Sequence, residues 1–556
     1  MDRAERLANP SFLKNYSATL RALKLSPQEE LAKEKLPAWV KQLPGPLHDP
    51  HLVAGDAFKI WMESQFHGDN HMLTKEWSDK YTGGDGNYVV PNLTVGWNKT
   101  PAIVPWLIIC DPDDHMRIAR DHPKKSTVHD GGLTGQSFLA HVDVSQWRMQ
   151  RSHLLQAMLP KTVFSTMLPT MHDSCLELVE RLKAGEGGTY FAGNDRPQPA
   201  LNINELMLDT AFRILGRTLF GESDDFIVAN SQRVRWAMQH LDDMQGLPAK
   251  ILKEWCQNLR TRAEARMATD TSNELIAKNG PVMQLLLSSK DNYITEVEGH
   301  KGAERHLLDN IGIVSFAGHD TTGNTLTWCL MELARNREWQ KQCQQEVDAV
   351  FASLGGKPLQ YTDFQKLKTL TQCVNETLRM WTAVPYGSNR ELVHDETVKG
   401  PNGESITVPA GTELIVPNFS QHRSEALWGA DAGEWKPSRW KGFSDPEGTS
   451  INFTPDGDEV GCPVFATKNP ESRRFHPFTH SPRDCYGKNF AQTEIRVVLA
   501  HVLHHFDFAL AEPSKSLVQQ NADQLAFMIS GILKVRDGMW MYVTPRSDTN
   551  QPQSRL

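Results

Sequence analysis

A single cysteine, Cys485, stands in the segment FTHSPRDCYGKNFAQTEIR, residues 478–496, directly before a run with helical periodicity. Arg483 places a fixed positive charge two residues before the sulfur, and the predicted helix points its N-terminal dipole at it. Both features favour a thiolate over a thiol. Gly487 lets a flat ligand approach the backbone, and Phe478 can shield the sulfur from water. The alternative is a small buried hydrophobic residue, the usual state of a free cysteine.

A shielded, hydrogen-bonded thiolate suits the axial coordination of a haem iron. The segment resembles the cysteine loop of the cytochrome P450 family, which has Phe, then Gly, Arg or His, Cys and Gly at fixed offsets. This chain supplies Phe478, Arg483, Cys485 and Gly487 at those offsets, and it has Ser481 where the family has its first glycine. Because serine reaches positive φ less easily than glycine, we expect a reshaped or strained turn there. The resemblance implies haem b as cofactor, with Cys485 as its axial ligand.

A second unusual stretch is AGHDTT, residues 317–322, inside a long apolar helical pattern. Gly, Asp and paired Thr are poor residues for a buried helix interior. The stretch resembles the family's distal helix, which implies that Asp320 relays protons from solvent and that Thr321 holds dioxygen and its water. Small residues at 317 and 318 would leave room for a diatomic ligand. The Thr321 hydroxyl is expected to donate to the Ala317 carbonyl and to open the helix locally; the alternative is a kinked helix without chemistry.

Two shorter motifs predict a buried charge cluster. ETLR, residues 376–379, places Glu376 and Arg379 on one helix face, which by itself is most simply a surface ion pair. PSRW, residues 437–440, resembles the family's next motif and supplies Arg439. The resemblance implies a buried Glu-Arg-Arg cluster with a structural role behind the haem.

Cations for the haem propionates are expected from three segments. In QWRMQR, residues 146–151, Trp147 and Arg151 lie one turn apart, so an indole N–H and a guanidinium share a helix face. The family's third helix carries W-x-x-x-R in this role, and the strand after the ETLR helix supplies Arg390. Together with Arg483, the resemblance implies three arginines for two carboxylates.

Helical periodicity dominates from about residue 140, and strand-like segments are few and short. Helices are predicted over residues 146–159, 203–220, 250–267, 309–336 and 338–351. Strands are predicted within residues 105–110, 405–417 and 538–545. The pattern predicts a mainly α fold with minor β (α+β) in a single large domain, and the resemblance implies the cytochrome P450 fold. We expect a polar N-terminal extension over 1–42, a catalytic domain over 43–546 and a C-terminal tail over 547–556.

Composition limits the partners and the compartment. The formal net charge is -8 and no long basic run occurs, which argues against nucleic acid. The eight scattered cysteines include no CxxC pair, which favours a reducing compartment. No apolar run is long enough for a transmembrane helix. Segment 12–25 is most simply a helix docked on its own domain, and the alternative is a helix that lies on a membrane surface. From the cysteines and this segment, we expect the protein on the cytoplasmic side, either soluble or peripherally associated with the endoplasmic reticulum membrane.

The resemblance implies a haem-thiolate monooxygenase that inserts one atom of O2 into a lipophilic organic substrate. Because we find no GxGxxG loop and no space for a flavin or iron–sulfur domain, electrons are expected from an NADPH-dependent cytochrome P450 reductase or a ferredoxin-type donor. The donor is expected to dock near Arg148, Arg483 and Lys488. Two alternatives stay open: an isomerase or dehydratase that acts on lipid peroxides without a reductase, and a haem-binding sensor without turnover. The pair of Asp320 and Thr321 weighs against the sensor.

The resemblance also places the substrate pocket among five segments with many apolar side chains, which favours a lipophilic substrate. These segments are the loop before Trp147 and residues 241–248, 314–316, 383–386 and 527–531. Fatty acids, terpenoids, polyketides and aromatic compounds all remain open as substrates.

Overall fold

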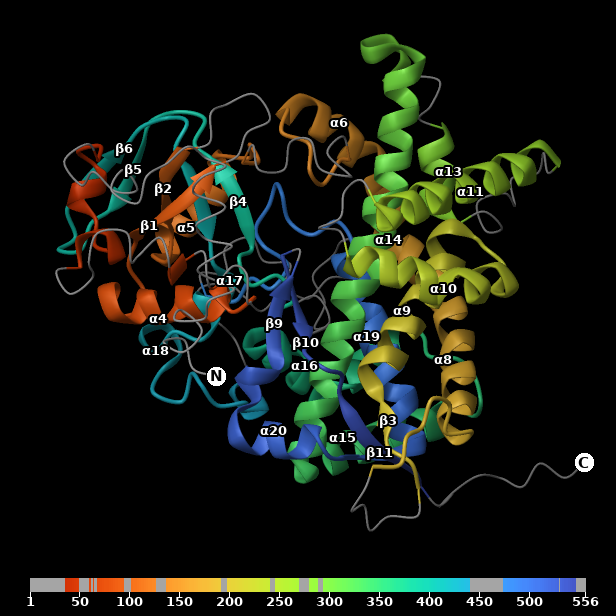
Figure 1. Cartoon of the computed structure of the whole chain (residues 1–556). Helices are drawn as coiled ribbons and strands as arrows, with labels where there is room; N and C mark the ends of the chain where they lie inside the picture. Colours follow the sequence, from red (N-terminus) through yellow and green to blue (C-terminus); the bar gives the residue numbers. More distant parts are fainter. Residues whose placement is uncertain are drawn as a thin grey trace, which may run out of the picture.

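The computed structural model describes residues 36–49, 60–61, 64, 68–94, 102–126, 137–191, 198–240, 246–269, 280–288, 294–440, 474–529 and 531–546. The amphipathic segment 12–25 and the predicted C-terminal tail lie outside these residues. Within them, a sheet-rich part with β1, β2 and β4–β6 stands beside a larger helical part, and the long helix α14 runs through the helical part (Figure 1).

The helices carry most of the described chain, and each of the five helices predicted from periodicity is present. They are α4 (Asn70–Thr82), α5 (Pro112–Asp121), α6 (Val144–Leu155), α7 (Pro160–Thr162), α8 (Leu168–Lys183), α9 (Ile203–Phe220), α10 (Asp224–Gln239), α11 (Leu247–Thr269), α13 (Pro281–Ser288), α14 (Ile294–Arg335), α15 (Arg337–Leu354), α16 (Lys368–Met380), α17 (Asn418–His422), α18 (Glu425–Trp428), α19 (Lys488–His505) and α20 (Ser514–Asn521). Only α14 differs clearly from its prediction, because it begins well before residue 309.

The strands form small sheets, as the sequence predicts. They are β1 (Tyr88–Thr94), β2 (Ala102–Ile108), β3 (Leu201–Asn202), β4 (Ser388–Glu391), β5 (Glu396–Lys399), β6 (Ser405–Val408), β7 (Glu413–Val416), β8 (Phe506–Leu510), β9 (Ala526–Ile529), β10 (Ile532–Val535) and β11 (Trp540–Pro545). The sheets have the orders β1-β2-β7-β4, β3-β11-β8, β10-β9 and β5-β6. In the four-stranded sheet β2 and β7 run parallel and the other pairs run antiparallel, which leaves β4 at an edge.

Helix α14 is the centre of the helical core and packs closely against α9. A Cβ atom at Gly318 would lie 2.2 Å from Cδ1 of Leu215, and one at Gly323 would lie 2.8 Å from the Cα of Leu208. Both contacts are shorter than van der Waals distance, so the two glycines allow the close approach of α9. Gly318 also lines the cavity beside Cys485, so its lack of a side chain both allows the helix contact and leaves space in the cavity.

A second core lies under the sheet-rich part. Trp39, Val40 and Leu43 pack there with Val89 of β1 and Leu414 of β7. The packed body thus includes residues before Leu43, where the sequence analysis begins the catalytic domain. In the described part of the chain, no helix combines the length and the apolar character needed to cross a bilayer.

Candidate active site

A cavity with mostly apolar walls lies between the cysteine loop and α14. Its walls come from the loop before α6, from α14 and from the start of α19; they include Phe138, Leu139, Ile313, Val314, Ala317, Thr321, Cys485, Tyr486, Phe490 and Ala491. The sulfur of Cys485 and the hydroxyl of Thr321, both selected from sequence, therefore line one shared space.

The cysteine loop holds Cys485 by backbone contacts. The Cys485 N–H donates to the Phe478 carbonyl at 2.8 Å, and Gly487 directly precedes α19, as predicted. Burial raises the pKa of the Cys485 thiol. The backbone N–H of Gly487 and the charges of Arg151 and Lys488 act in the opposite direction. A backbone N–H at the start of α19 and two nearby cations therefore favour the thiolate, whereas burial opposes it.

Arg483 makes contacts that the sequence did not indicate. Its Nε and Nη2 donate to the carbonyls of Pro123 and His141, each at 2.8 Å, and its guanidinium lies 4.1 Å from the Trp147 ring centre. These contacts tie the cysteine loop to the segments around Pro123 and His141 and to α6. Because Arg483 is buried, the prediction that it helps to dock a redox partner is wrong.

Two buried arginines, Arg390 and Arg483, and the half-buried Lys125 lie close together beside the cysteine loop. Burial, together with Arg390 and Arg151, lowers the pKa of Arg483 to about 9, and burial lowers the pKa of Arg390 to about 10. Burial and the charges of Arg390 and Arg483 also hold the pKa of Lys125 well below its usual value. Sequence reasoning missed Lys125, which lies in a short PKKS loop with no distinctive pattern. Arg151, predicted to join the cations, pairs with Asp484 at 2.6 Å.

These residues fit the two propionates of a haem b. The buried Nη1 of Arg483 has no hydrogen-bond partner within the described chain. Buried donors are normally satisfied, and mutually repelling cations call for anions between them. Two carboxylates at this position would meet both requirements, and guanidinium–carboxylate pairing is strong and directional.

The distal side follows the prediction in part. Thr321 Oγ1 donates to the Ala317 carbonyl at 2.8 Å, as expected. However, α14 continues through this turn as α-helix, so the predicted local opening is absent.

The strained turn of the cysteine loop is also displaced from its predicted place, because the positive φ lies at Thr479 (58°), two residues before Ser481.

Asp320 lies in a buried ion pair. One of its carboxylate oxygens is 2.6 Å from Nζ of Lys534 on β10, and the side chains are 2% and 7% exposed. Asn324 Nδ2 donates to the other oxygen at 3.1 Å. Asp320 is thus a buried, paired acid, and the proton relay expected from it stays a prediction. The only sequence signal for Lys534 is a lysine inside the apolar strand ILKV.

We expect Lys534→Met to destabilise the holoenzyme by about 3–5 kcal/mol, because it leaves the buried Asp320 carboxylate without its partner. Thermal unfolding followed at the haem absorbance band measures the loss. The double variant Asp320→Asn/Lys534→Met should recover part of it, since both charges are then removed. Equal stability of Lys534→Met and the parent protein would contradict a stabilising ion pair.

The predicted charge cluster is present around Glu376. Its carboxylate accepts from Nε and Nη2 of Arg379 at 2.9 and 2.8 Å and from Nε of Arg439 at 2.9 Å. The Lys436 backbone N–H (2.8 Å) and the Trp440 indole N–H (2.9 Å) complete the shell. Glu376 and Arg379 are fully buried, so the ETLR pair is a core element and not a surface ion pair.

The predicted substrate segments divide into two groups. The loop before Trp147 and residue Val314 line the cavity above Cys485. Residues 383–386 contact the hairpin of β9 and β10, where the Leu533 N–H donates to the Ala383 carbonyl at 2.9 Å. Neither segment lines the cavity above Cys485. Residues 241–245 lie outside the described residues.

A half-buried cysteine, a threonine hydroxyl that lines the same cavity and a cluster of cations beside the cysteine loop fit the site of a haem-thiolate enzyme. Comparison with known proteins agrees with this class. The family model "Cytochrome P450" matches residues 105–532, and the chain belongs to the cytochrome P450 family. It is a monooxygenase whose haem is ligated by a cysteine thiolate.

Several relatives and one solved structure support the assignment. A 7-deoxyloganic acid hydroxylase of Catharanthus roseus is 26% identical over 82% of this chain and 86% of its own length. Cytochrome P450 714B1 of Oryza sativa subsp. japonica is 27% identical over 79% of this chain and 76% of its own. The heme domain of cytochrome P450DA has the same fold, with a TM-score of 0.65, 16% identity and coverage of 91% of this chain and 98% of that one.

Proposed function

We propose that the protein hydroxylates a lipophilic small molecule with electrons from a separate reductase. The balanced reaction is RH + O2 + 2 e⁻ + 2 H⁺ → ROH + H2O. The observation that carries the proposal is the mostly apolar cavity between Cys485 and Thr321. The name of the Catharanthus roseus relative, a hydroxylase, supports the reaction type. No observation favours the alternative isomerase or dehydratase.

The haem, bound through Cys485, supplies the activation of dioxygen and accepts the electrons. The residues of the chain have the task of excluding bulk water and holding protons. Since the Thr321 hydroxyl donates its own proton to the Ala317 carbonyl, its oxygen lone pairs are available to accept from a water in the cavity. Because Asp320 is held by Lys534, proton transfer through its carboxylate requires this ion pair to loosen.

Electron transfer requires a partner close to the cysteine loop. The side chain of Arg148 is exposed on α6, and Lys488 is half-buried at the start of α19, beside Asp484. We propose that these two residues, without the buried Arg483, contribute to a docking surface for an acidic redox partner.

The proposed location is the cytoplasmic side, either in solution or peripherally on the endoplasmic reticulum. The seven described cysteines form no disulfide, and Cys343 and Cys373 stay unbonded with their sulfurs 3.6 Å apart. The scattered spacing of the eight cysteines, without a CxxC pair, is what supports a reducing compartment. Membrane contact depends on segment 12–25, and fractionation of cells that express the chain with and without that segment tests it.

We expect Thr321→Ala to lower product formation by roughly 10²-fold, the lower end of the contribution of a positioned proton-transfer group. Oxygen consumption should fall less, so that the ratio of product to O2 drops. The matched control is Thr325→Ala on the same helix, because the Thr325 hydroxyl makes the same bond to the carbonyl four residues earlier, at 2.8 Å. An unchanged ratio in Thr321→Ala would contradict its role.

The reaction type is tested by turnover of the purified holoenzyme under two conditions. A panel of lipophilic ligands is first screened for shifts of the Soret band, which select a substrate. Product should form with NADPH and a reductase under O2. Turnover of a lipid peroxide without reductase, together with no turnover under the first condition, would favour the isomerase or dehydratase.

A further inference from the structure

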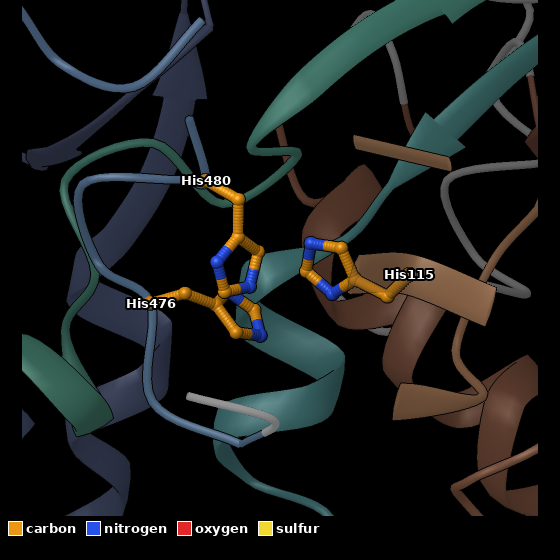
Figure 2. A group of neighbouring side chains, drawn as sticks. All are labelled: His115, His476 and His480. Atoms are coloured by element: carbon orange, nitrogen blue, oxygen red, sulfur yellow. The ribbon is translucent and has the colours of Figure 1, made fainter. Parts of the chain in front are cut away.

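Three buried histidines from distant parts of the chain meet behind the cysteine loop. His115 comes from α5, and His476 and His480 come from the cysteine loop; their rings lie close together in Figure 2. One ring nitrogen from each histidine lies within 4.8 Å of the corresponding nitrogens of the other two. All three side chains are buried.

The ring of His115 has a defined tautomer. Its Nδ1 lies 2.6 Å from Oε1 of Gln421, and the Gln421 amide Nε2 donates to the Cys110 carbonyl at 2.9 Å. Since Oε1 can only accept, Nδ1 of His115 carries the proton and Nε2 keeps its lone pair. A metal-binding histidine is usually held in this way, with the other ring N–H bonded to an oxygen.

The ring of His476 is held in the same manner. Its Nδ1 lies 3.0 Å from Oδ1 of Asn418, and Nδ2 of Asn418 donates to the Val384 carbonyl at 3.2 Å. The proton is therefore on Nδ1, and the lone pair is on Nε2. This Nε2 is buried and has no hydrogen-bond partner among the described residues, which is unusual for a buried polar atom.

The surroundings keep the rings of His115 and His476 neutral, which is the form that binds metals. Burial holds the pKa of His115 and of His476 well below the usual value for histidine. The neighbouring His422 does not supply a further Nε2 lone pair, because that atom accepts from the His476 backbone N–H at 3.1 Å.

We propose that His115, His476 and His480 bind a zinc ion or a similar late first-row transition metal, which ties the cysteine loop to α5. Three imidazoles with an open fourth position are a known ligand set for zinc, and imidazole suits this group of metals. With Zn–N bonds of about 2.0–2.1 Å, the nitrogens would have to close to roughly 3.4 Å from one another. Because the ligands are neutral, we expect an anion such as hydroxide or chloride in the fourth position.

A second group, His122, His394 and Glu396, lacks the same properties. Both ring nitrogens of His122 are already used: Nε2 bonds to Glu396 at 2.8 Å, and Nδ1 accepts from the Val393 N–H at 3.0 Å. No lone pair of His122 is left for a metal, so the proposal is restricted to the three histidines behind the cysteine loop.

Metal analysis of the holoenzyme tests the proposal, with the haem iron as internal standard. The protein is produced with added Zn²⁺ and dialysed against metal-free buffer, and zinc and iron are measured by mass spectrometry. We expect about one zinc per iron, and a zinc content at least roughly 10-fold lower in His115→Gln and His480→Gln. His240→Gln, which changes an exposed histidine at the end of α10, should keep the zinc.

A zinc content far below the iron content in the parent protein would overturn the proposal, as would equal zinc in the parent protein and the two ligand variants. If the variants do not incorporate haem, titration of the chelator-treated parent holoenzyme with Zn²⁺ decides the question. Uptake of one equivalent with a rise in Tm supports the site, and no uptake overturns it. Because the readout is zinc per iron, the result is independent of the proposed hydroxylation.

Discussion

Replacing Cys485 by serine will abolish monooxygenase turnover and remove the red-shifted band of the ferrous carbonyl complex. A thiolate donates electron density to the haem iron far more strongly than a hydroxyl does, and this donation favours cleavage of the O–O bond. The loop should still form, because Cys485 is held by its backbone N–H, which bonds to the Phe478 carbonyl. We therefore expect folded protein with reduced haem content and product formation at the background level.

The measurement is a reduced carbonyl difference spectrum combined with a haem assay and a turnover assay. Cys256→Ala is a suitable control, since Cys256 is a buried free cysteine of α11, outside the walls of the cavity. It should keep the red-shifted band even if its stability falls. A red-shifted band in Cys485→Ser, or a colourless parent protein supplied with haem, would contradict thiolate ligation by Cys485.

The features that sequence could predict are those encoded in short segments. Cys485 and Gly487 depend on local spacing, and Glu376 and Arg379 share one turn of α16, so both motifs could be found by their patterns. The helices could be predicted for the same reason, since the spacing of apolar residues along a helix is a property of the local sequence. The direction in which a long side chain points is set by tertiary contacts and cannot be read from the neighbouring sequence. The contacts of Arg483 with the carbonyls of Pro123 and His141 could therefore not be predicted, although its place in the loop could.

Contacts between distant segments could not be predicted from a single sequence. Lys534 reaches Asp320 only because β10 packs against α14. The three histidines behind the cysteine loop meet because α5 lies beside that loop, and nothing near His115 in the sequence indicates this neighbour. In both cases, tertiary packing turns ordinary polar residues into buried groups that need partners.

Because buried charged groups need their partners, we expect Glu376→Gln, although it lies behind the haem site, to cause a large loss of stability. Two acceptor oxygens receive five hydrogen bonds from Arg379, Arg439, Lys436 and Trp440. Glutamine keeps the shape but replaces one acceptor by a donor. It leaves the buried Arg379 guanidinium without a counter-charge and Arg439 with Asp431 as its remaining partner. Removal of one member of a buried ion cluster costs about 3–5 kcal/mol.

That loss is a large part of the roughly 5–15 kcal/mol by which a protein is stable, so little folded holoenzyme of Glu376→Gln should accumulate. Haem content per milligram and thermal unfolding of the soluble fraction measure the effect. Glu434→Gln is the matched control, because it removes the same charge from an exposed side chain only two residues before Lys436. Both variants lose one negative charge, so a general charge effect would affect them equally. Normal haem content and Tm in Glu376→Gln would show that the cluster is not needed to hold the fold behind the haem.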